Sequence, residues 1–249
     1  MKKFCAGALL VCLTLVMILS GCDSSKPVSN TKMLRVGVVD NLYNFSFYNE
    51  KATQYSGIAV DVANEIAKRI DYGQVRYVAI NSETREEKLL NGEIDCIVTT
   101  MTITDERKDK FDFSTPFYTD NFEMLIENTT GFKKIDDLKG KTIGTMSTNT
   151  MKNELIKMYG ENNIKIVTDA DFSVLDKKLE IGEVDALFLD GCVAGGIINE
   201  NRQVIYKTSK NNNYGVVTKK GSELSKPIDD AVQSIMSDGT MTDIIDKWD

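Results

Sequence analysis

The sequence of 249 residues contains no histidine, and this absence removes a large class of chemistry. Without imidazole the chain cannot build a Ser-His or Cys-His nucleophile system or the usual zinc sites, so we expect neither a metal nor a cofactor. An excess of positive charge is also absent, since the formal net charge is −7 and no basic stripe occurs. An acidic chain of this kind is a poor partner for nucleic acid.

Extended apolar runs are absent except at the N-terminus, where Phe4–Leu19 is apolar. This run is too short for a comfortable membrane-spanning helix, and with the lysines before it the run is typical of a secretory signal. The sequence Leu19-Ser20-Gly21-Cys22 resembles the lipobox of bacterial lipoproteins, whose cysteine is acylated. We therefore expect a lipoprotein signal peptide over residues 1–21, and a lipidated Cys22 at the start of a flexible tether over residues 22–32. An ordinary cleaved signal is the alternative.

Cysteine is rare in the chain that follows Cys22, where Cys96 and Cys192 are the two that remain. Each lies in an apolar stretch, and an isolated cysteine in such a context behaves as a small hydrophobic residue. We therefore expect two buried free thiols rather than a disulfide or a reactive pair.

The remaining sequence alternates between two apolar periodicities. Short β-branched runs predict strands, and apolar residues that recur every three or four positions predict helices with one buried face. Strands are expected at 33–39, 75–80 and 94–99, with helices at 58–70 and 84–90 between them. The pattern then repeats, with strands at 141–146, 164–168 and 184–189 and helices at 150–159 and 172–181. This alternation predicts an α/β architecture with mostly parallel sheets covered by helices.

The segments around these two blocks complete the prediction. Residues 40–56 are expected to form an aromatic, turn-rich loop. Further strands are expected at 122–127 and 214–218, and further helices at 224–236 and 241–248. Trp248 is expected to pack the end of the chain onto a core.

A short internal similarity supports two lobes. The stretch from Leu89 to Asp95 parallels the stretch from Leu179 to Asp185, and in each a glycine ends a helix before an acidic residue leads into a strand. We assign residues 33–124 and 214–249 to lobe 1 and residues 125–213 to lobe 2. The crossings between the lobes are expected near residues 127–130 and 209–213.

A polar loop over residues 99–107 follows the apolar run at 94–98. It therefore lies at the carboxyl end of a predicted buried strand, where ligands bind in open α/β sheets. Its threonines supply small donor and acceptor groups, and Arg107 supplies a planar fork suited to a carboxylate or phosphate. Alternatively, Arg107 pairs with a neighbouring acid, namely Asp105, Glu106 or Asp109, on a solvated helix. Thr104 is expected to cap that helix.

The order of these motifs resembles bacterial extracytoplasmic solute-binding protein family 3, the substrate-binding lipoproteins of amino-acid ABC transporters. The resemblance covers nearly the whole mature chain, and it implies a type II periplasmic-binding-protein fold with two lobes joined by a two-strand hinge. The motifs that carry it are Leu34–Val38, Gly57, Val60–Ala63, Gly92–Asp95, Met101–Arg107, Phe113–Tyr118, Asp137–Gly144, Asp238–Thr240 and Lys247–Trp248. Phe113, Phe117 and Tyr118 are expected to pack in the core and at the lobe junction.

The resemblance also implies a ligand site between the lobes. Arg107 would bind the α-carboxylate of an amino acid, assisted by Thr102, and the backbone carbonyl of Thr100 would face the α-ammonium group. From lobe 2, the N–H of Thr150 at a helix start would meet the same carboxylate, and Asp190 would lie opposite the ammonium. A helix N-terminus and an arginine both favour an anion, whereas an aspartate favours a cation.

Two parts of the expected site depart from the family pattern. The helix that begins near Asn149 lacks the glycine that usually precedes it in the stretch from Ser147 to Thr150. The positions of the usual aromatic residues fall on Leu42, with Tyr43 beside it, and near Ser82. Leu42, Tyr43 and Asn149 are therefore included in the expected site, and the side-chain specificity stays open.

The leading functional hypothesis is a substrate-binding lipoprotein of an ABC importer. It would capture a polar amino acid or a close analogue, deliver it to the membrane permease, and act as a monomer held by its lipid on the outer face of the cell membrane. An enzyme on the same scaffold, similar to cyclohexadienyl or arogenate dehydratases, is the alternative, with Asp40, Glu83 and Asp190 as candidate carboxyl groups. The ligand-binding domain of a sensor is a third hypothesis. We expect no enzymatic activity.

Overall fold

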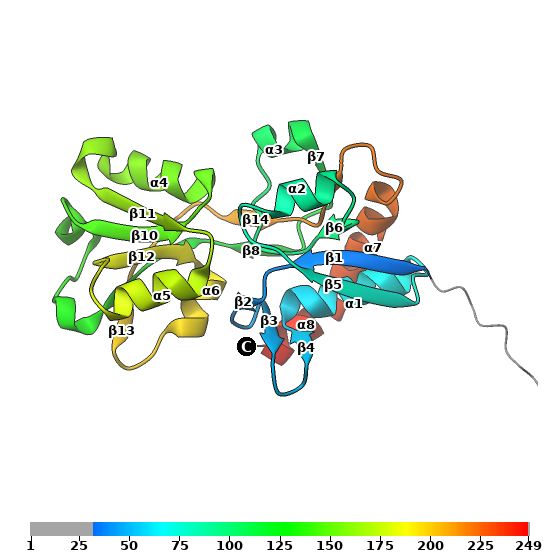
Figure 1. Cartoon of the computed structure of the whole chain (residues 1–249), viewed down its shortest axis with the longest axis horizontal. Coiled ribbons are helices and arrows are strands. Elements are labelled where there is room, and N and C mark those ends of the chain that lie inside the picture. Colours follow the sequence, from blue (N-terminus) through cyan, green and yellow to red (C-terminus); the bar gives the residue numbers. More distant parts are fainter. Residues whose placement is uncertain (1–31, 249) are drawn as a thin grey trace, which may run out of the picture. The chain divides into compact units, whose positions relative to one another are not determined.

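The computed structural model describes residues 32–248. The predicted signal peptide, the lipidation site Cys22 and nearly all of the tether lie outside the described residues. Within residues 32–248, none of the helices is both long enough and apolar enough to span a membrane. This part of the chain contains two five-stranded sheets with helices around them (Figure 1).

The first sheet has the strand order β5-β1-β6-β15-β7. Its strands are β1 (Met33–Val38), β5 (Gln74–Ala79), β6 (Cys96–Ile97), β7 (Phe111–Phe113) and β15 (Val217–Lys219). β1 runs parallel to β5 and β6, whereas β15 runs antiparallel to β6 and β7. The helices of this half are α1 (Ile58–Arg69), α2 (Arg85–Leu90), α3 (Asp105–Lys110), α7 (Ser225–Ser237) and α8 (Thr240–Trp248).

The second sheet repeats this pattern with the order β11-β10-β12-β9-β13. Its strands are β9 (Phe122–Glu127), β10 (Thr142–Met146), β11 (Lys165–Asp169), β12 (Ala186–Asp190) and β13 (Arg202–Lys207). β10 is parallel to β11 and β12, and β9 is antiparallel to β12 and β13. Its helices are α4 (Asn149–Tyr159), α5 (Phe172–Glu180) and α6 (Gly191–Ile197). The predicted alternation and the fold class are confirmed.

The internal sequence similarity has a structural cause. Asp95 Oδ2 accepts a hydrogen bond from the backbone N–H of Arg35 at 2.8 Å, and Asp185 Oδ2 accepts one from the N–H of Thr142 at 2.8 Å. In each sheet the aspartate thus satisfies an N–H near the start of the strand next to the parallel edge, β1 or β10. The preceding glycines, Gly92 and Gly182, have φ values of 74° and 72°, which favour glycine at the end of a helix.

Two short strands connect the sheets, and they pair with each other. β8 (Tyr118–Asp120) runs antiparallel to β14 (Asn212–Tyr214), and both lie between the sheets in Figure 1. The ring of Tyr118 stacks on that of Tyr214 with centroids 6.1 Å apart, and Phe117 is buried next to them in the chain. The expected packing of Phe117 and Tyr118 at the lobe junction is therefore confirmed.

The first crossing lies earlier in the chain than we expected. The sequence suggested a crossing near residues 127–130, with lobe 1 extending to residue 124, but Phe122–Met124 already pair with β12 in the second sheet. Residues 122–126 are all buried, because this apolar run is an interior strand of the second sheet. The crossing is instead the short strand β8 before it. The expected strand at 214–218 is likewise divided between β14 and β15.

The expected loop at 40–56 is wrong, because the segment forms a small antiparallel sheet. Its strands are β2 (Asn41–Leu42), β3 (Ser46–Asn49) and β4 (Gln54–Ser56). These strands are too short to show a period, and their turns use Asn44 and Thr53 at positive φ. Gly57 follows at φ 123°, where an added Cβ would lie 2.5 Å from the carbonyl oxygen of Phe45. Only glycine allows this close approach at the start of α1.

Trp248 packs the last helix against the first, as predicted. Its Nε1 donates to Asp61 Oδ2 of α1 at 2.7 Å, and its ring meets the ring of Phe47 edge-on at 5.8 Å. The Lys247 ammonium forms an ion pair with the same carboxylate at 2.7 Å. The end of the described chain therefore belongs to the first half of the fold.

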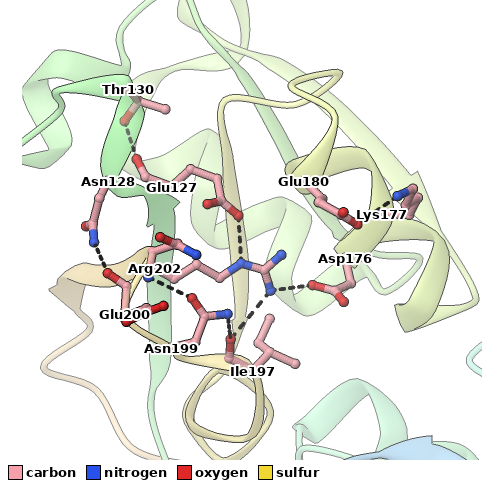
Figure 2. A network of polar contacts seen from close by, with 11 residues as sticks. Glu127, Asn128, Thr130, Asp176, Lys177, Glu180, Ile197, Asn199, Glu200 and Arg202 are labelled. Atoms are coloured by element: carbon pink, nitrogen blue, oxygen red, sulfur yellow. Dashed lines mark hydrogen bonds and ion pairs between the residues drawn. The ribbon is translucent and has the colours of Figure 1, made fainter.

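An ion-pair network around Arg202 holds the edge strand β13 to the second sheet (Figure 2). Arg202 Nε donates to Glu127 Oε1 of β9 at 2.7 Å, and Nη1 donates to Asp176 of α5. The Arg202 side chain is only 8% exposed. Lys177 and Glu180 form an exposed pair on α5 in the same view. Removing one member of a buried pair leaves the other charges uncompensated, whereas exposed pairs contribute little.

We predict that Arg202→Ala lowers the free energy of unfolding by about 2 kcal/mol, because the partly buried carboxylates of Glu127 and Asp176 lose their shared counter-charge. Lys177→Ala is the matched control, and it should change the same quantity by less than about 1 kcal/mol. Urea denaturation followed by circular dichroism measures both. Equal losses in the two variants would contradict a structural role for the network.

Candidate binding cavity between the sheets

A cavity with about 580 Å³ of empty space, including its open mouth, lies between the two sheets. Its polar lining on the side of the first sheet consists of Ser82, Arg85, Thr99, Thr100, Thr102 and Arg107. The second sheet and its helices contribute Thr148, Thr150 and Asp190, with apolar residues between them. Most of these positions follow the carboxyl ends of parallel strands, which is where the sequence predicted the site.

Arg107 lies on α3, immediately after the polar loop. Thr104 caps this helix as predicted, because its Oγ1 accepts from the backbone N–H of Arg107 at 3.3 Å. Arg107 Nη1 donates to the carbonyl oxygen of Thr102 at 2.7 Å, which turns the guanidinium back toward the loop. Burial lowers the pKa of Arg107, although it stays charged at neutral pH.

The neighbouring acids do not neutralise Arg107. Asp105 pairs with Lys108, and Glu106 pairs with Lys110, both on the exposed side of α3. Arg107 forms no ion pair with any residue between 32 and 248. The alternative in which Arg107 serves only as a partner for Asp105, Glu106 or Asp109 is therefore wrong.

Asp190 ends β12 and is 4% exposed. Its Oδ1 accepts a hydrogen bond from the hydroxyl of Tyr214 on the crossing strand β14. Burial raises the pKa of Asp190 to about 7, while the hydroxyls of Tyr214 and Thr100 act in the opposite direction. Although Asp190 occupies the position before α6, its side chain makes no capping hydrogen bond to that helix. Asp120 takes that role, accepting from the N–H of Cys192 at 2.8 Å.

Arg85 also lines the cavity, and the sequence analysis missed it. It is the first residue of α2 and is 6% exposed. Burial and the nearby charge of Arg107 lower its pKa to about 10, so it is protonated at neutral pH. A cation in the first turn of a helix opposes the helix dipole. That unfavourable placement, in the first turn of the predicted helix at 84–90, was the signal in the sequence.

The start of α4 forms the opposite wall of the cavity. Thr148 precedes the helix without a side-chain capping bond, and Thr148, Thr150 and Met151 line the cavity. Backbone N–H groups in a first helical turn have no partner within the helix, so they can bind an anion. Asn149 belongs to the same turn, and its side chain is outside the described part of the structure.

Leu42 and Tyr43 were expected in the site, because the aromatic position of the family falls on them. The structure places one of the two at the cavity. Leu42 is 3% exposed and lines the wall. Tyr43 is 53% exposed and is not among the lining residues, so its expected place in the site is wrong. It packs across Gly196 of α6, where an added Cβ would lie 2.5 Å from the Cβ of Tyr43. Consecutive residues at the end of β2 point in different directions, which explains the difference.

Direct polar contacts also connect the two halves near the cavity. Asn41 Nδ2 of β2 donates to Asp171 Oδ1, which precedes α5, at 2.6 Å. Asp171 Oδ1 also accepts from the N–H of Ser173 at 2.8 Å, so it caps α5 at the same time. Polar groups from both halves of the fold thus meet outside the cavity as well as inside it.

The cavity combines opposite charges from different parts of the fold. Arg85 and Arg107 supply cations, and Asp190 supplies a carboxyl group that is an anion above its pKa of about 7. Such a cavity can hold a small ligand that carries both kinds of charge. Of the carboxyl groups considered for acid–base chemistry, Asp190 lines the cavity, whereas Asp40 and Glu83 do not. In the described part of the chain, Cys96 is buried, Cys192 is partly exposed, and both are free thiols.

We predict that ionisation of Asp190 costs stability as the pH rises. Its pKa is about 7 in the folded chain against 3.8 as the ordinary value, so folding favours the protonated form between those limits. Relative to Asp190→Asn, the free energy of unfolding of the ligand-free protein should fall by up to about 1.4 kcal/mol per pH unit across this window. Urea denaturation at several pH values measures the difference. Glu161→Gln, at an exposed carboxylate, should follow the original profile, and parallel profiles for Asp190→Asn would contradict the prediction.

Known proteins resemble this chain over most of its length. The ABC transporter glutamine-binding protein GlnH of Bacillus subtilis (strain 168) is 29% identical over 232 residues, which cover 91% of this chain and 84% of the relative. The solved arginine-, lysine-, histidine-binding protein ArtJ from Geobacillus stearothermophilus has a TM-score of 0.78 and 29% identity, covering 87% of this chain and 95% of that chain. The ancestral amino acid-binding protein AncCDT-1, a precursor of cyclohexadienyl dehydratase, has a TM-score of 0.77 and 26% identity, covering 87% and 94%.

The family model agrees with the architecture. The model of the bacterial extracellular solute-binding proteins, family 3, matches residues 34–249, which include both sheets and the cavity between them. The chain belongs to the bacterial extracellular solute-binding proteins, family 3.

Proposed function

We propose that this protein is the substrate-binding component of an ABC importer and captures an α-amino acid in the cavity between its sheets. The observation that carries the proposal is the placement of Arg107 and Asp190, which come from different halves of the fold and line the same cavity. An α-amino acid carries a carboxylate and an ammonium on one carbon. Opposite charges on facing walls suit that pair.

The contacts follow from the chemistry of each group. The ligand carboxylate binds the guanidinium of Arg107, with the Thr102 hydroxyl and the backbone N–H groups at the start of α4, including that of Thr150, as further donors. The ammonium binds the carboxylate of Asp190 and the carbonyl oxygen of Thr100. Because the ligand contacts both halves, its binding favours the arrangement in which they are close.

Transport is better supported than catalysis. The relatives described above are binding proteins by name, and the solved neighbour related to a dehydratase is itself named an amino acid-binding protein. In the cavity, Asp190 is the one ionisable carboxyl group among the described lining residues, and the ammonium of the ligand occupies it. A dehydratase needs a free acid or base at the reacting atoms.

The sequence before residue 32 supports the location of the protein. A signal over residues 1–21 and acylation of Cys22 would anchor the chain to the outer face of the cell membrane, with residues 22–32 as the tether. A single anchored monomer can then deliver its ligand to the permease of the importer.

Ligand binding should stabilise the purified full-length chain. With bound ligand removed by dialysis from denaturant, at least one amino acid among the standard set should raise the melting temperature, because ligand at about 100 times its Kd adds about 2.7 kcal/mol. Differential scanning fluorimetry measures this. If no amino acid shifts the melting temperature, the proposed function is wrong.

Arg107→Ala should raise the Kd of that amino acid by at least about 100-fold, because a desolvated charge pair is lost. Lys108→Ala is the matched control, since Lys108 lies on the same helix with an exposed side chain and does not line the cavity. Isothermal titration calorimetry measures both variants. Unchanged affinity in Arg107→Ala would refute its carboxylate role.

Cys22→Ser should release the chain from the membrane fraction of cells that export it, because the acylated sulfur is absent. Immunoblots of membrane and soluble fractions measure the distribution, with Cys96→Ser as the control at a buried thiol. Equal membrane retention of the original chain and Cys22→Ser would contradict lipid anchoring at Cys22.

A further inference from the structure

The cavity carries more positive than negative charge. Its charged lining residues are Arg85, Arg107 and Asp190. In the proposed function, the α-carboxylate of the ligand occupies Arg107, and the α-ammonium occupies Asp190. Arg85 is then left without a paired carboxylate, although Glu86 and Asp190 raise its pKa from beyond ion-pair distance. A buried cation without a paired counter-charge is unfavourable.

The side chain of Arg85 forms no hydrogen bond or ion pair with the residues that the structure describes. Its Nε makes no hydrogen bond to any residue in the range 32–248, and no carboxylate in that range forms an ion pair with it. Outside the cavity, arginines with shielded side chains are paired, since Arg69 binds Asp238 and Arg202 binds Glu127. Buried polar groups are nearly always satisfied, so an unsatisfied Nε on an arginine that lines a cavity points to a group supplied from outside.

Arg85 also lies close enough to Arg107 for their charges to repel. The charge of Arg107 is, after burial, the strongest influence that lowers the pKa of Arg85. One carboxylate can neutralise one of these guanidinium groups in a bidentate pair. A ligand with two carboxylates neutralises both.

Two hydroxyl groups of the cavity share this lack of partners. Ser82 Oγ and Thr99 Oγ1 are buried without a hydrogen bond in the described part of the chain, and both residues line the cavity. Each hydroxyl can donate to a carboxylate oxygen, as can Arg85 Nε. Each of these three unsatisfied groups can therefore donate a hydrogen bond. A carboxylate of the ligand, which only accepts hydrogen bonds, suits them.

We propose that the ligand is an α-amino acid with an acidic side chain, and that its second carboxylate binds Arg85. This inference rests on the proposed function, because it uses Arg107 and Asp190 for the α-groups. It differs from what the names of the relatives specify, which are glutamine and the basic amino acids arginine, lysine and histidine.

The test compares ligands that differ by one charge. Isothermal titration calorimetry of the full-length chain at neutral pH, after removal of bound ligand, uses L-glutamate, L-glutamine, L-aspartate, L-asparagine and L-arginine. At least one acidic amino acid should bind about 30-fold or more tightly than its amide, because the amide leaves Arg85 without a counter-charge. L-arginine should bind more weakly still, since it adds a third guanidinium to the cavity.

Variants of Arg85 separate a binding role from a structural one. Arg85→Gln should remove the preference, so that the ratio of the Kd of the amide to that of the acid falls by about 30-fold, while binding of the amide changes by less than about 3-fold. Arg85→Lys should retain part of the preference, because the positive charge stays. Arg76→Gln, at an exposed arginine of β5, is the matched control for loss of one charge and should keep the original ratio.

The outcomes distinguish this inference from the function on which it rests. If a neutral or basic amino acid binds more tightly than both acidic ones, the inference is wrong and the proposed function stands. If no amino acid binds at all, both are wrong. The comparison of acid with amide in the original protein needs no variant, so the test holds even if Arg85→Gln does not fold.

Discussion

The hydrogen bond between Tyr214 and Asp190 is the interaction on which the cavity depends most. It joins the end of a buried strand in the second sheet to one of the two strands that connect the sheets. Tyr214 is fully buried, and its ring packs against Tyr118 and Phe45. Apolar packing therefore positions the donor, and the donor in turn positions the carboxylate of the cavity. The anionic wall is thus part of the core rather than a mobile surface group.

Much of the fold could be predicted from the sequence because its signals are local. β9 has the bounds that its apolar run predicted, and α1 follows from apolar residues at helical spacing. The errors occurred where the decisive contacts are distant in sequence. Nothing in a three-residue strand such as β8 indicates that it pairs with β14, and the strands between residues 41 and 56 depend on turns at Asn44 and Thr53.

The candidate site shows the same contrast between local signals and contacts that are distant in sequence. Arg107 and Asp190 lie in motifs and at strand ends, so the sequence was enough to place both at the cavity. Arg85 differs because its importance comes from an Nε that has no hydrogen-bond partner in the described part of the chain. Such a lack can be recognised only when the neighbouring side chains are known. Tyr43 shows the opposite case, since proximity in sequence to Leu42 suggested a contact that the direction of its side chain prevents. The excess of cationic groups in the cavity is therefore a property of the folded chain.

The contact between Asn41 and Asp171 has a further consequence for the energetics of the two halves. Asp171 is already held in place by Ser173, whose N–H and hydroxyl both donate to the same oxygen at 2.8 and 2.7 Å. Its rotamer is thus fixed by the start of α5 whether or not Asn41 is present. Only Asn41 loses side-chain freedom when the two meet. A contact of this kind therefore forms and breaks at low entropic cost.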